Sequence, residues 1–233
     1  MWLDRFIPLE QRRKRLLKII PDGHLHQFLK TPVPDRNQDV RNCHFISIDL
    51  ETSGFDPKHD HILSIGFVEL HDQCVDMSTA RHWVIHSDQQ LKESNVAIHQ
   101  LTDDVVSAGM SLRNAMQQLL PILAGHILLA HNASIETGFL NQACLRIYGY
   151  PLLIPVVDTL KLAHQTLSRH QNAIPQGKLR LAALREHYHL PRYKSHNALT
   201  DAIATGELFL AQLAERTSNN TQALQIRRIL SRF

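Results

Sequence analysis

The sequence predicts an α/β domain in which a mixed β-sheet is flanked by helices. Three early segments are short, rich in β-branched and aromatic residues, and separated by polar turns, which is typical of successive antiparallel strands. Farther along the chain, helical patterns alternate with short apolar runs. The two patterns together indicate one sheet with helices packed against it.

The strands and helices are predicted, in chain order, from the local pattern of apolar residues. The early strands are expected at His44–Leu50, Ile62–Leu70 and Ala80–Ile85. The alternating part predicts a helix at Leu112–Leu120, a strand at His126–Ala130, a helix at Ser134–Tyr148 and a strand at Ile154–Val157. Three more helices complete the domain, at Thr159–Leu167, Leu179–His189 and Asn197–Leu213.

The two ends of the chain differ from this pattern. Apolar residues surround a basic cluster between residues 12 and 18, which predicts a basic amphipathic helix that Pro21 ends. Two further prolines mark a linker to about residue 42, and the last residues indicate a polar turn with a short basic helix. We therefore expect an N-terminal extension at 1–41, a catalytic domain at 42–215 and a tail at 216–233. The first helix either packs on its own domain or contacts a partner or nucleic acid.

The composition narrows the class of protein. The 233 residues, 43% of them hydrophobic, suffice for one good-sized domain with short extensions. A formal charge of +3 is too small for a histone-like binder, so any affinity for nucleic acid must come from local patches. Three scattered cysteines argue against a disulfide framework, and the apolar runs are too short to span a bilayer. We expect a cytoplasmic protein without membrane contact.

The most informative pattern is five ionisable residues in a fixed order. Asp49 and Glu51 end the first strand, and strand geometry directs both carboxylates to one face and the alternating apolar residues to the other. Glu136 lies near the start of a predicted helix, and His196 and Asp201 close the series. Four carboxylates and one imidazole suffice to build a two-metal phosphodiesterase.

The sequence around these residues resembles the DEDDh 3′→5′ exonucleases, which include the polymerase III proofreading subunit. The three motifs are residues 48–54 (IDLETSG), 130–140 (AHNASIETGFL) and 196–202 (HNALTDA). Two further stretches, 97–102 and 157–163, are similar to that family and lie between the motifs in the expected order. The resemblance covers about residues 42 to 213 and implies a ribonuclease-H-like fold.

One position departs from the family pattern. The second motif of the family normally carries aspartate where this chain has Glu136, and no other acid lies between Asp104 and Asp158. Either Glu136 supplies that metal ligand or the site lacks it. Both residue types offer the same oxygen ligands and the same charge, which favours an active site with altered metal preference or rate over an inactive one.

The expected cofactors are two divalent cations, Mg²⁺ or Mn²⁺, because hard cations prefer oxygen ligands. We expect Asp49 between the two ions, with Glu51, Glu136 and Asp201 completing their shells. His196 is the candidate general base, since an imidazole can take a proton from the attacking water near neutral pH.

Helix geometry constrains how the last motif is placed. Five residues on a helix correspond to about 140° of rotation, so His196 and Asp201 cannot share a helical face. We expect His196 just before the helix, Asn197 at its N-cap and Asp201 one turn inside. Similarly, we expect Ser134 to be the N-cap of the second-motif helix and Asp158 to be the N-cap of the next one.

The substrate contacts come from the resemblance alone. It implies that Thr52, Ser53 and Phe55 contact the terminal nucleotide, with Phe55 as a stacking face, although an ordinary core aromatic fits equally well. By the same resemblance, Asn132 orients the second motif or touches the substrate. Residues 59–61, His-Asp-His, are interpreted as a solvated hairpin loop because no matching ligand motif accompanies them.

The predicted function is a metal-dependent 3′→5′ exonuclease that releases nucleoside 5′-monophosphates from single-stranded DNA or RNA 3′ ends. A catalytically weak or inactive nucleic-acid-binding module associated with a polymerase is the alternative. A polymerase-associated subunit that acts mainly through its N-terminal helix or its C-terminal tail is a second one. The motifs do not separate DNA from RNA, because recognition of the 2′-hydroxyl depends on other contacts.

Overall fold

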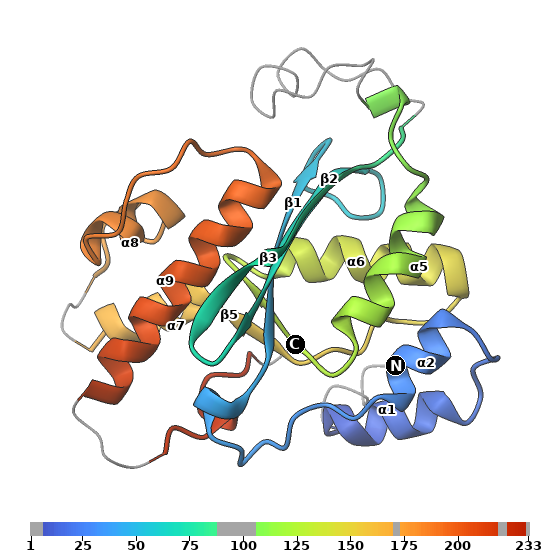
Figure 1. Ribbon diagram of the computed structural model, residues 1–233, viewed down its shortest axis with the longest axis horizontal. Coiled ribbons are helices and arrows are strands. Elements are labelled where there is room, and N and C mark those ends of the chain that lie inside the picture. The colour runs from blue at the N-terminus through green and yellow to red at the C-terminus, as the bar shows by residue number, and fades with distance from the viewer. Residues whose placement is uncertain (1–6, 88–105, 170–172, 219–222, 232–233) are drawn as a thin grey trace.

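The computed structural model describes residues 7–87, 106–169, 173–218 and 223–231 (Figure 1). Its centre is a five-stranded mixed sheet with the strand order β3-β2-β1-β4-β5. The strands are β1 Phe45–Thr52, β2 Ile62–His71, β3 Cys74–Val84, β4 Ile127–Ala130 and β5 Val156–Asp158. β1, β2 and β3 pair antiparallel, whereas β4 and β5 join β1 in parallel. The predicted α/β class and mixed sheet are confirmed.

The β2–β3 hairpin is longer than predicted. Asp72 and Gln73 both have positive φ angles, 50° and 59°, as a tight two-residue hairpin turn requires. β3 therefore begins at Cys74, directly after this turn, and not at Ala80 as expected. The polar residues between these positions are half-buried or exposed, which hid the strand from the search for apolar runs.

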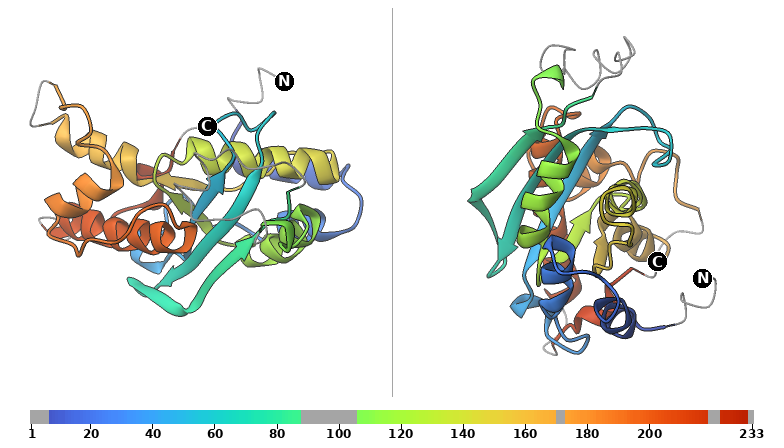
Figure 2. Two further views of the ribbon diagram at one scale, coloured as in Figure 1. Left: turned by 90° about the horizontal axis from the view of Figure 1, so that it is seen from above. Right: turned by 90° about the vertical axis from the view of Figure 1, so that its right-hand side faces the viewer.

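The helices cover both faces of the sheet, as the sequence predicted (Figure 2). They are α1 Leu9–Leu17, α2 His24–Lys30, α5 Leu112–Leu123, α6 Ser134–Tyr148, α7 Thr159–Leu167, α8 Leu181–His187 and α9 Ala198–Ser218. Alternate side chains of β1 pack on the two faces of the sheet. Ile46, Ile48 and Leu50 belong to the core shared with α5 and α6, and Phe45 belongs to the core shared with α9.

The N-terminal helices are part of the larger core. α1 is the predicted basic helix, and its buried Leu16 lies in one cluster with Phe28 of α2 and Met116 of α5. α2 was not predicted, because Pro32 and Pro34 in a polar stretch indicated a linker after Pro21. This packing agrees with the interpretation of a helix on its own domain. The boundaries drawn at residues 41 and 215 stay predictions.

Two 3₁₀ helices, η2 Val40–Asn42 and η3 Ile226–Arg228, pack side by side at the end of the sheet. Val40 donates its backbone N–H to the carbonyl of Leu224, and both Val40 and Ile226 are buried in the same cluster. The tail thus contains a 3₁₀ helix with Arg227 and Arg228, where the sequence predicts a short basic helix. Within the described ranges, no helix combines the length and apolar composition needed to cross a membrane.

Candidate active site

The first two carboxylates lie at the carboxyl end of β1, the central strand. Asp49 and Glu51 are two residues apart, so both side chains leave the strand on the same face, toward α9. Asp49 pairs with Gly66 of β2 in the antiparallel register. The face predicted to carry the chemistry is therefore the face that α9 covers.

A glycine allows α9 to reach this face. A Cβ atom added at Gly66 would lie 2.1 Å from the backbone carbon of Ala198, so only glycine leaves room for the helix to begin against β2. Ser47 of β1 also donates its hydroxyl to the carbonyl of Ala202 across 2.6 Å. These two contacts fix the first turns of α9, and with them Asp201, beside Asp49.

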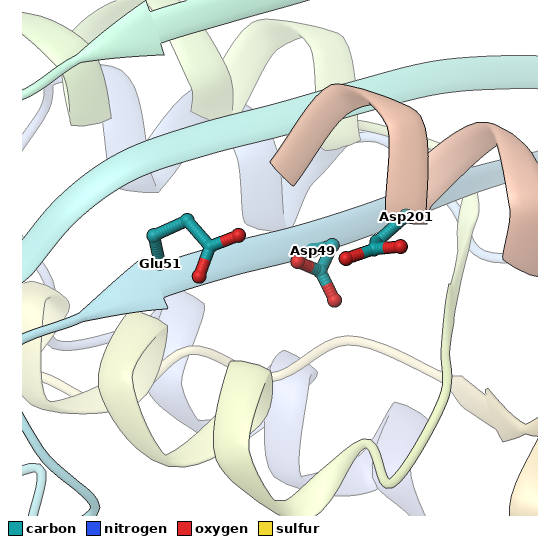
Figure 3. Close-up of side chains that lie close together, drawn as sticks. All are labelled: Asp49, Glu51 and Asp201. Carbon is teal, nitrogen blue, oxygen red and sulfur yellow. The ribbon is translucent and has the colours of Figure 1, made fainter. Parts of the chain in front are cut away.

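Three of the four predicted carboxylates form a compact cluster. Ligand oxygens of Asp49, Glu51 and Asp201 all lie within 4.8 Å of one another. Figure 3 shows Asp49 between the other two, with Glu51 toward the end of β1 and Asp201 on the first turns of α9. Among the described residues, no other group of three His, Cys, Asp or Glu side chains meets this distance.

Burial and mutual repulsion raise the pKa values of the clustered carboxylates. Burial raises the pKa of Asp49 well above its usual value, and the charges of Glu136, Glu51 and Asp201 raise it further. Burial and the charge of Asp201 raise the pKa of Glu51 to about 7. The pKa of Asp201 is raised as well, chiefly by burial. Carboxylates that repel one another in a buried pocket gain most from a divalent cation.

Glu136 lies beside this cluster but is not one of its three members. It belongs to the first turn of α6 and is 4% exposed, and burial raises its pKa to about 8. Its Oε2 atom is buried and has no hydrogen-bond partner among the described residues. A buried oxygen without a donor is costly unless a cation binds it. Glu136, Asp49, Glu51 and Asp201 therefore fit a divalent-metal site in burial, charge and ligand type.

The capping of α6 corrects one expectation. Ser134 is the first helical residue, and the N-cap position belongs to Ala133, which makes no side-chain capping bond. The hydroxyl of Ser134 instead donates to Oδ1 of Asn132 across 3.1 Å. Asn132 has a positive φ of 66°, which asparagine tolerates better than most residues. The turn between β4 and α6 is thus made by Asn132.

His196 and Asp201 are arranged as the helix geometry predicted. His196 lies just before α9, Asn197 caps the helix by accepting the backbone N–H of Thr200 across 3.1 Å, and Asp201 lies one turn inside. The backbone N–H of His196 donates to Oδ2 of Asp201 across 2.8 Å, and His196 has a positive φ of 69°. The His196 residue is exposed.

The segment after β1 shows how the predicted substrate residues are placed. Phe55 is 85% exposed, so the interpretation as a core aromatic is wrong. The hydroxyl of Thr52 donates to the carbonyl of Gly54 across 2.7 Å, and the hydroxyl of Ser53 bonds Oδ1 of Asp60 across 3.2 Å. Both hydroxyls thus shape the loop that carries Phe55.

The remaining polar motif residues support the backbone. Oδ1 of Asp158 accepts the backbone N–H groups of Asn132, Leu160 and Lys161, so its predicted N-cap role at α7 is confirmed. His59 of the His-Asp-His loop bonds Asp56 and does not belong to the three-carboxylate cluster. The family-like stretch 97–102 lies outside the described residues.

The sequence motifs missed a cavity beside Asp201. It has a volume of about 620 Å³ and is formed by residues before α8, by α8 itself and by the segment that leads to His196. Four cationic residues line it, namely Lys178, Arg180, Arg185 and Arg192. These residues fall between the second and third motifs, and no spacing in the sequence indicates that they meet at one site.

Comparisons with known proteins place this site in a family. The family RNase_T, described as an exonuclease family, matches residues 46–209 of this chain. DNA polymerase III PolC-type of Thermotoga petrophila is 29% identical over 175 residues, which is 75% of this chain and 12% of that protein. The PolC-type enzyme of Oceanobacillus iheyensis is 30% identical over 195 residues, covering 79% of this chain and 13% of that enzyme. The chain thus spans about one eighth of these relatives.

Solved structures show the same fold at low identity. The nuclease domain of 3′hExo, a DEDDh family member bound to rAMP, has a TM-score of 0.64 with 15% identity and covers 76% of this chain and 95% of that one. Exonuclease X in complex with 5′-overhanging duplex DNA has a TM-score of 0.57 with 21% identity, covering 79% and 98%. The chain therefore belongs to the RNase_T exonuclease family.

Proposed function

We propose that this protein is a metal-dependent exonuclease that removes nucleotides from single-stranded 3′ ends as nucleoside 5′-monophosphates. The observation that carries the proposal is the carboxylate cluster of Asp49, Glu51 and Asp201, with the buried Oε2 of Glu136, which has no hydrogen-bond partner in the described part of the chain, beside it. In a purely structural role, buried carboxylates that repel one another would destabilise the fold.

The four carboxylates would hold two divalent cations, with Mg²⁺ or Mn²⁺ as the candidates. Asp49 lies between Glu51 and Asp201, and these three residues together with Glu136 would hold the ions. Bound there, the cations offset the negative charge that builds up on the attacked phosphate and on the leaving oxygen.

His196 is proposed to act as the general base. Its exposed position beside Asp201 lets the imidazole take a proton from the water that attacks the terminal phosphodiester. The new P–O bond forms as the bond to the 3′ oxygen of the penultimate nucleotide breaks, and that oxygen receives a proton from solvent. The products are a nucleoside 5′-monophosphate and a strand shortened by one nucleotide.

The surroundings of the cluster support a single strand as substrate. Phe55 offers an exposed aromatic face on one side, on which a terminal base can stack. Lys178 and Arg180 line the cavity on the Asp201 side and can attract a phosphodiester backbone. Exonuclease I has been solved with single-stranded DNA, and its fold is shared by 76% of this chain with a TM-score of 0.63.

A polymerase is the proposed partner. The PolC-type relatives are polymerase III enzymes, and this chain matches about one eighth of their length. The cytoplasm is the proposed location of this protein.

The alternative is a catalytically weak or inactive nucleic-acid-binding module, which would apply if Glu136 cannot support the metal site. The test is degradation of 5′-labelled single-stranded DNA and RNA in Mg²⁺ and in Mn²⁺. We expect a ladder that shortens from the 3′ end, no ladder with Asp49→Ala protein, and a reduction of about 100-fold with Glu136→Gln. The Glu136→Asp variant, which restores the family residue, is expected to stay active.

Binding of the same strands without any ladder, in wild-type protein and in Glu136→Asp alike, would refute the enzyme. A ladder that appears only with Glu136→Asp would establish the weak module and identify Glu136 as its cause. Full activity of Glu136→Gln would show that the cations do not need this residue.

A further inference from the structure

The segment that carries His196 has no apolar anchor. Every residue from 191 to 197 is exposed, and the segment contains neither helix nor strand. A loop without buried side chains depends on polar contacts for its position. His196, the proposed general base, therefore belongs to a segment that hydrogen bonds must hold in place.

Buried Arg185 of α8 provides the main contact. It is 3% exposed, and its guanidinium donates to the carbonyl of Pro191 across 2.8 Å, at the beginning of this segment. The same guanidinium donates to the carbonyl of Ala204 across 2.7 Å and to Oε2 of Glu207 across 2.8 Å, both on α9. One side chain thus joins α8, the segment and the helix that carries Asp201.

Tyr193 closes the arrangement from the solvent side. Its ring lies over the guanidinium of Arg185, with the carbon of that group 4.5 Å from the ring centroid. Its hydroxyl donates to Oε1 of Glu207 across 2.9 Å, so the two oxygens of Glu207 bind Tyr193 and Arg185 at once. A cation held between a carboxylate and an aromatic face has a strongly restricted position.

The far end of the segment is fixed to the same helix. His196 donates its backbone N–H to Asp201, and Ala204 and Glu207 follow Asp201 at intervals of three residues along α9. Contacts with the first turns of α9 therefore hold both ends of the segment. The same turns carry Asp201, a proposed metal ligand.

We propose that Arg185, Tyr193 and Glu207 form a positioning clamp that holds the 191–197 segment so that His196 meets the attacking water. This inference rests on the proposed role of His196 as general base. The three residues are positioning residues, and their effect on the reaction passes through His196.

The test compares variants of the two tyrosines that bridge α8 or its loop to α9. Tyr193→Phe removes one hydroxyl of the clamp, and Tyr193→Ala also removes the ring, which is 40% exposed in the folded protein. Tyr188→Phe is the matched control, because the hydroxyl of Tyr188 donates to Glu215 of α9, away from the segment. We expect kcat on single-stranded DNA to fall about threefold in Tyr193→Phe and about tenfold in Tyr193→Ala, with KM within about twofold and no change in Tyr188→Phe.

A double-mutant cycle separates positioning from general loss of structure. In a His196→Ala background, Tyr193→Ala is expected to change the residual kcat less than about twofold, because the group that it positions is gone. Equal losses in both backgrounds, or a change in KM alone, would overturn the clamp.

Hydrogen exchange supplies a readout that needs no activity. The amide of His196, which is hydrogen-bonded to Asp201, should exchange faster in Tyr193→Ala than in wild type, while the amides that Asp158 accepts should keep their rate. Unchanged exchange in the segment would also overturn the clamp. Absence of any 3′-end degradation by the wild-type protein would refute the proposed function instead, and exchange would still report on whether the clamp holds the segment.

Discussion

The backbone N–H of His196 donates to Oδ2 of Asp201 across 2.8 Å, which couples the proposed base to a proposed metal ligand. The left-handed conformation of His196, with φ of 69°, directs this N–H back toward the first turn of α9. Because the contact uses the backbone, substitution of the imidazole leaves it in place. The chemical role of His196 can therefore be separated from the position of Asp201.

Replacement of His196 by glutamine should lower kcat about 100-fold, because general-base catalysis contributes about 10²–10⁴-fold. Affinity for Mn²⁺ in the absence of substrate should stay within about twofold of wild type, since the carboxylates are untouched. Single-turnover cleavage and Mn²⁺ titration by electron paramagnetic resonance measure the two quantities. A large loss of Mn²⁺ affinity would show that His196 acts on the metal site and not on the water.

The Asp49→Asn variant should be inactive and, without metal, more stable than wild type. Burial and three neighbouring carboxylates raise the pKa of Asp49, so its charged form costs free energy in the metal-free protein. A neutral side chain of the same shape removes that cost. The free energy of unfolding is therefore expected to rise by about 1–3 kcal/mol. Urea denaturation in EDTA measures it. A less stable variant would show that Asp49 has a structural role that its charge fulfils.

The metal-free protein should lose stability as the pH rises. The pKa values of Glu51 and Glu136 are raised to about 7 and about 8 from 4.5, so between 4.5 and these values the folded state holds protons that the unfolded state has released. Their stabilising effect is complete below the unfolded pKa and disappears as the pH passes the folded values. Thermal melts in EDTA between about pH 5 and pH 9 should show the decline.

Two controls belong to this pH series. Saturating Mg²⁺ should flatten or reverse the decline, because the cation favours the ionised carboxylates. Glu136→Gln should flatten the curve mainly at its upper end, where Glu136 loses its proton. A wild-type melting temperature that rises with pH in EDTA would contradict the assignment of raised pKa values to this cluster.

Truncation of Phe55 should weaken substrate binding and leave the fold intact. The ring is 85% exposed, so Phe55→Ala removes little buried surface and the free energy of unfolding should change by less than about 0.5 kcal/mol. Loss of base stacking, at about 1–3 kcal/mol per base, should raise KM for single-stranded DNA about tenfold. Met77→Ala is a matched control, since that side chain is also exposed and lies on β3. Equal KM values for the two variants would exclude stacking on Phe55.

The bounds of a helix could be predicted from the sequence where a capping residue marks its end. α6 and α7 have the predicted bounds, because Gly149 ends α6 in the left-handed region with φ of 79° and Asp158 caps α7 with its carboxylate. The placement of His196 before α9 followed from helix periodicity and the cap residue Asn197. Local chemistry of this kind is visible in a single sequence.

Contacts between distant segments were not visible in the sequence. A charged residue in a helical pattern predicts a solvated face, yet Arg185 is buried because its acceptors come from a loop and from another helix. The approach of α9 to β2 depends on Gly66, whose role appears only once the two elements are packed. The sequence motif also left open how near Glu136 would come to the other carboxylates, and it lies beside them, outside the three-residue cluster.

Arg13 of α1 is a second buried arginine whose acceptors lie in other segments. It is 4% exposed, its guanidinium lies over the ring of Phe28, and it donates to the carbonyls of Phe28, Leu29, Thr31 and Leu153. Arg13→Met should therefore lower the free energy of unfolding by about 3 kcal/mol, because several buried carbonyls lose their donor. Burial lowers the pKa of Arg13 to about 10, as expected for a cation enclosed by protein.

Arg12→Met is the control for this prediction, because Arg12 lies on the same helix and is only half-buried. Its substitution should change the free energy of unfolding by less than about 0.5 kcal/mol in urea titrations. Since neither residue approaches the carboxylate cluster, both variants should keep wild-type kcat at temperatures where they are folded. Equal stability of the two variants would mean that the buried guanidinium does not tie α1 to α2, and that apolar packing alone holds the N-terminal helices on the domain.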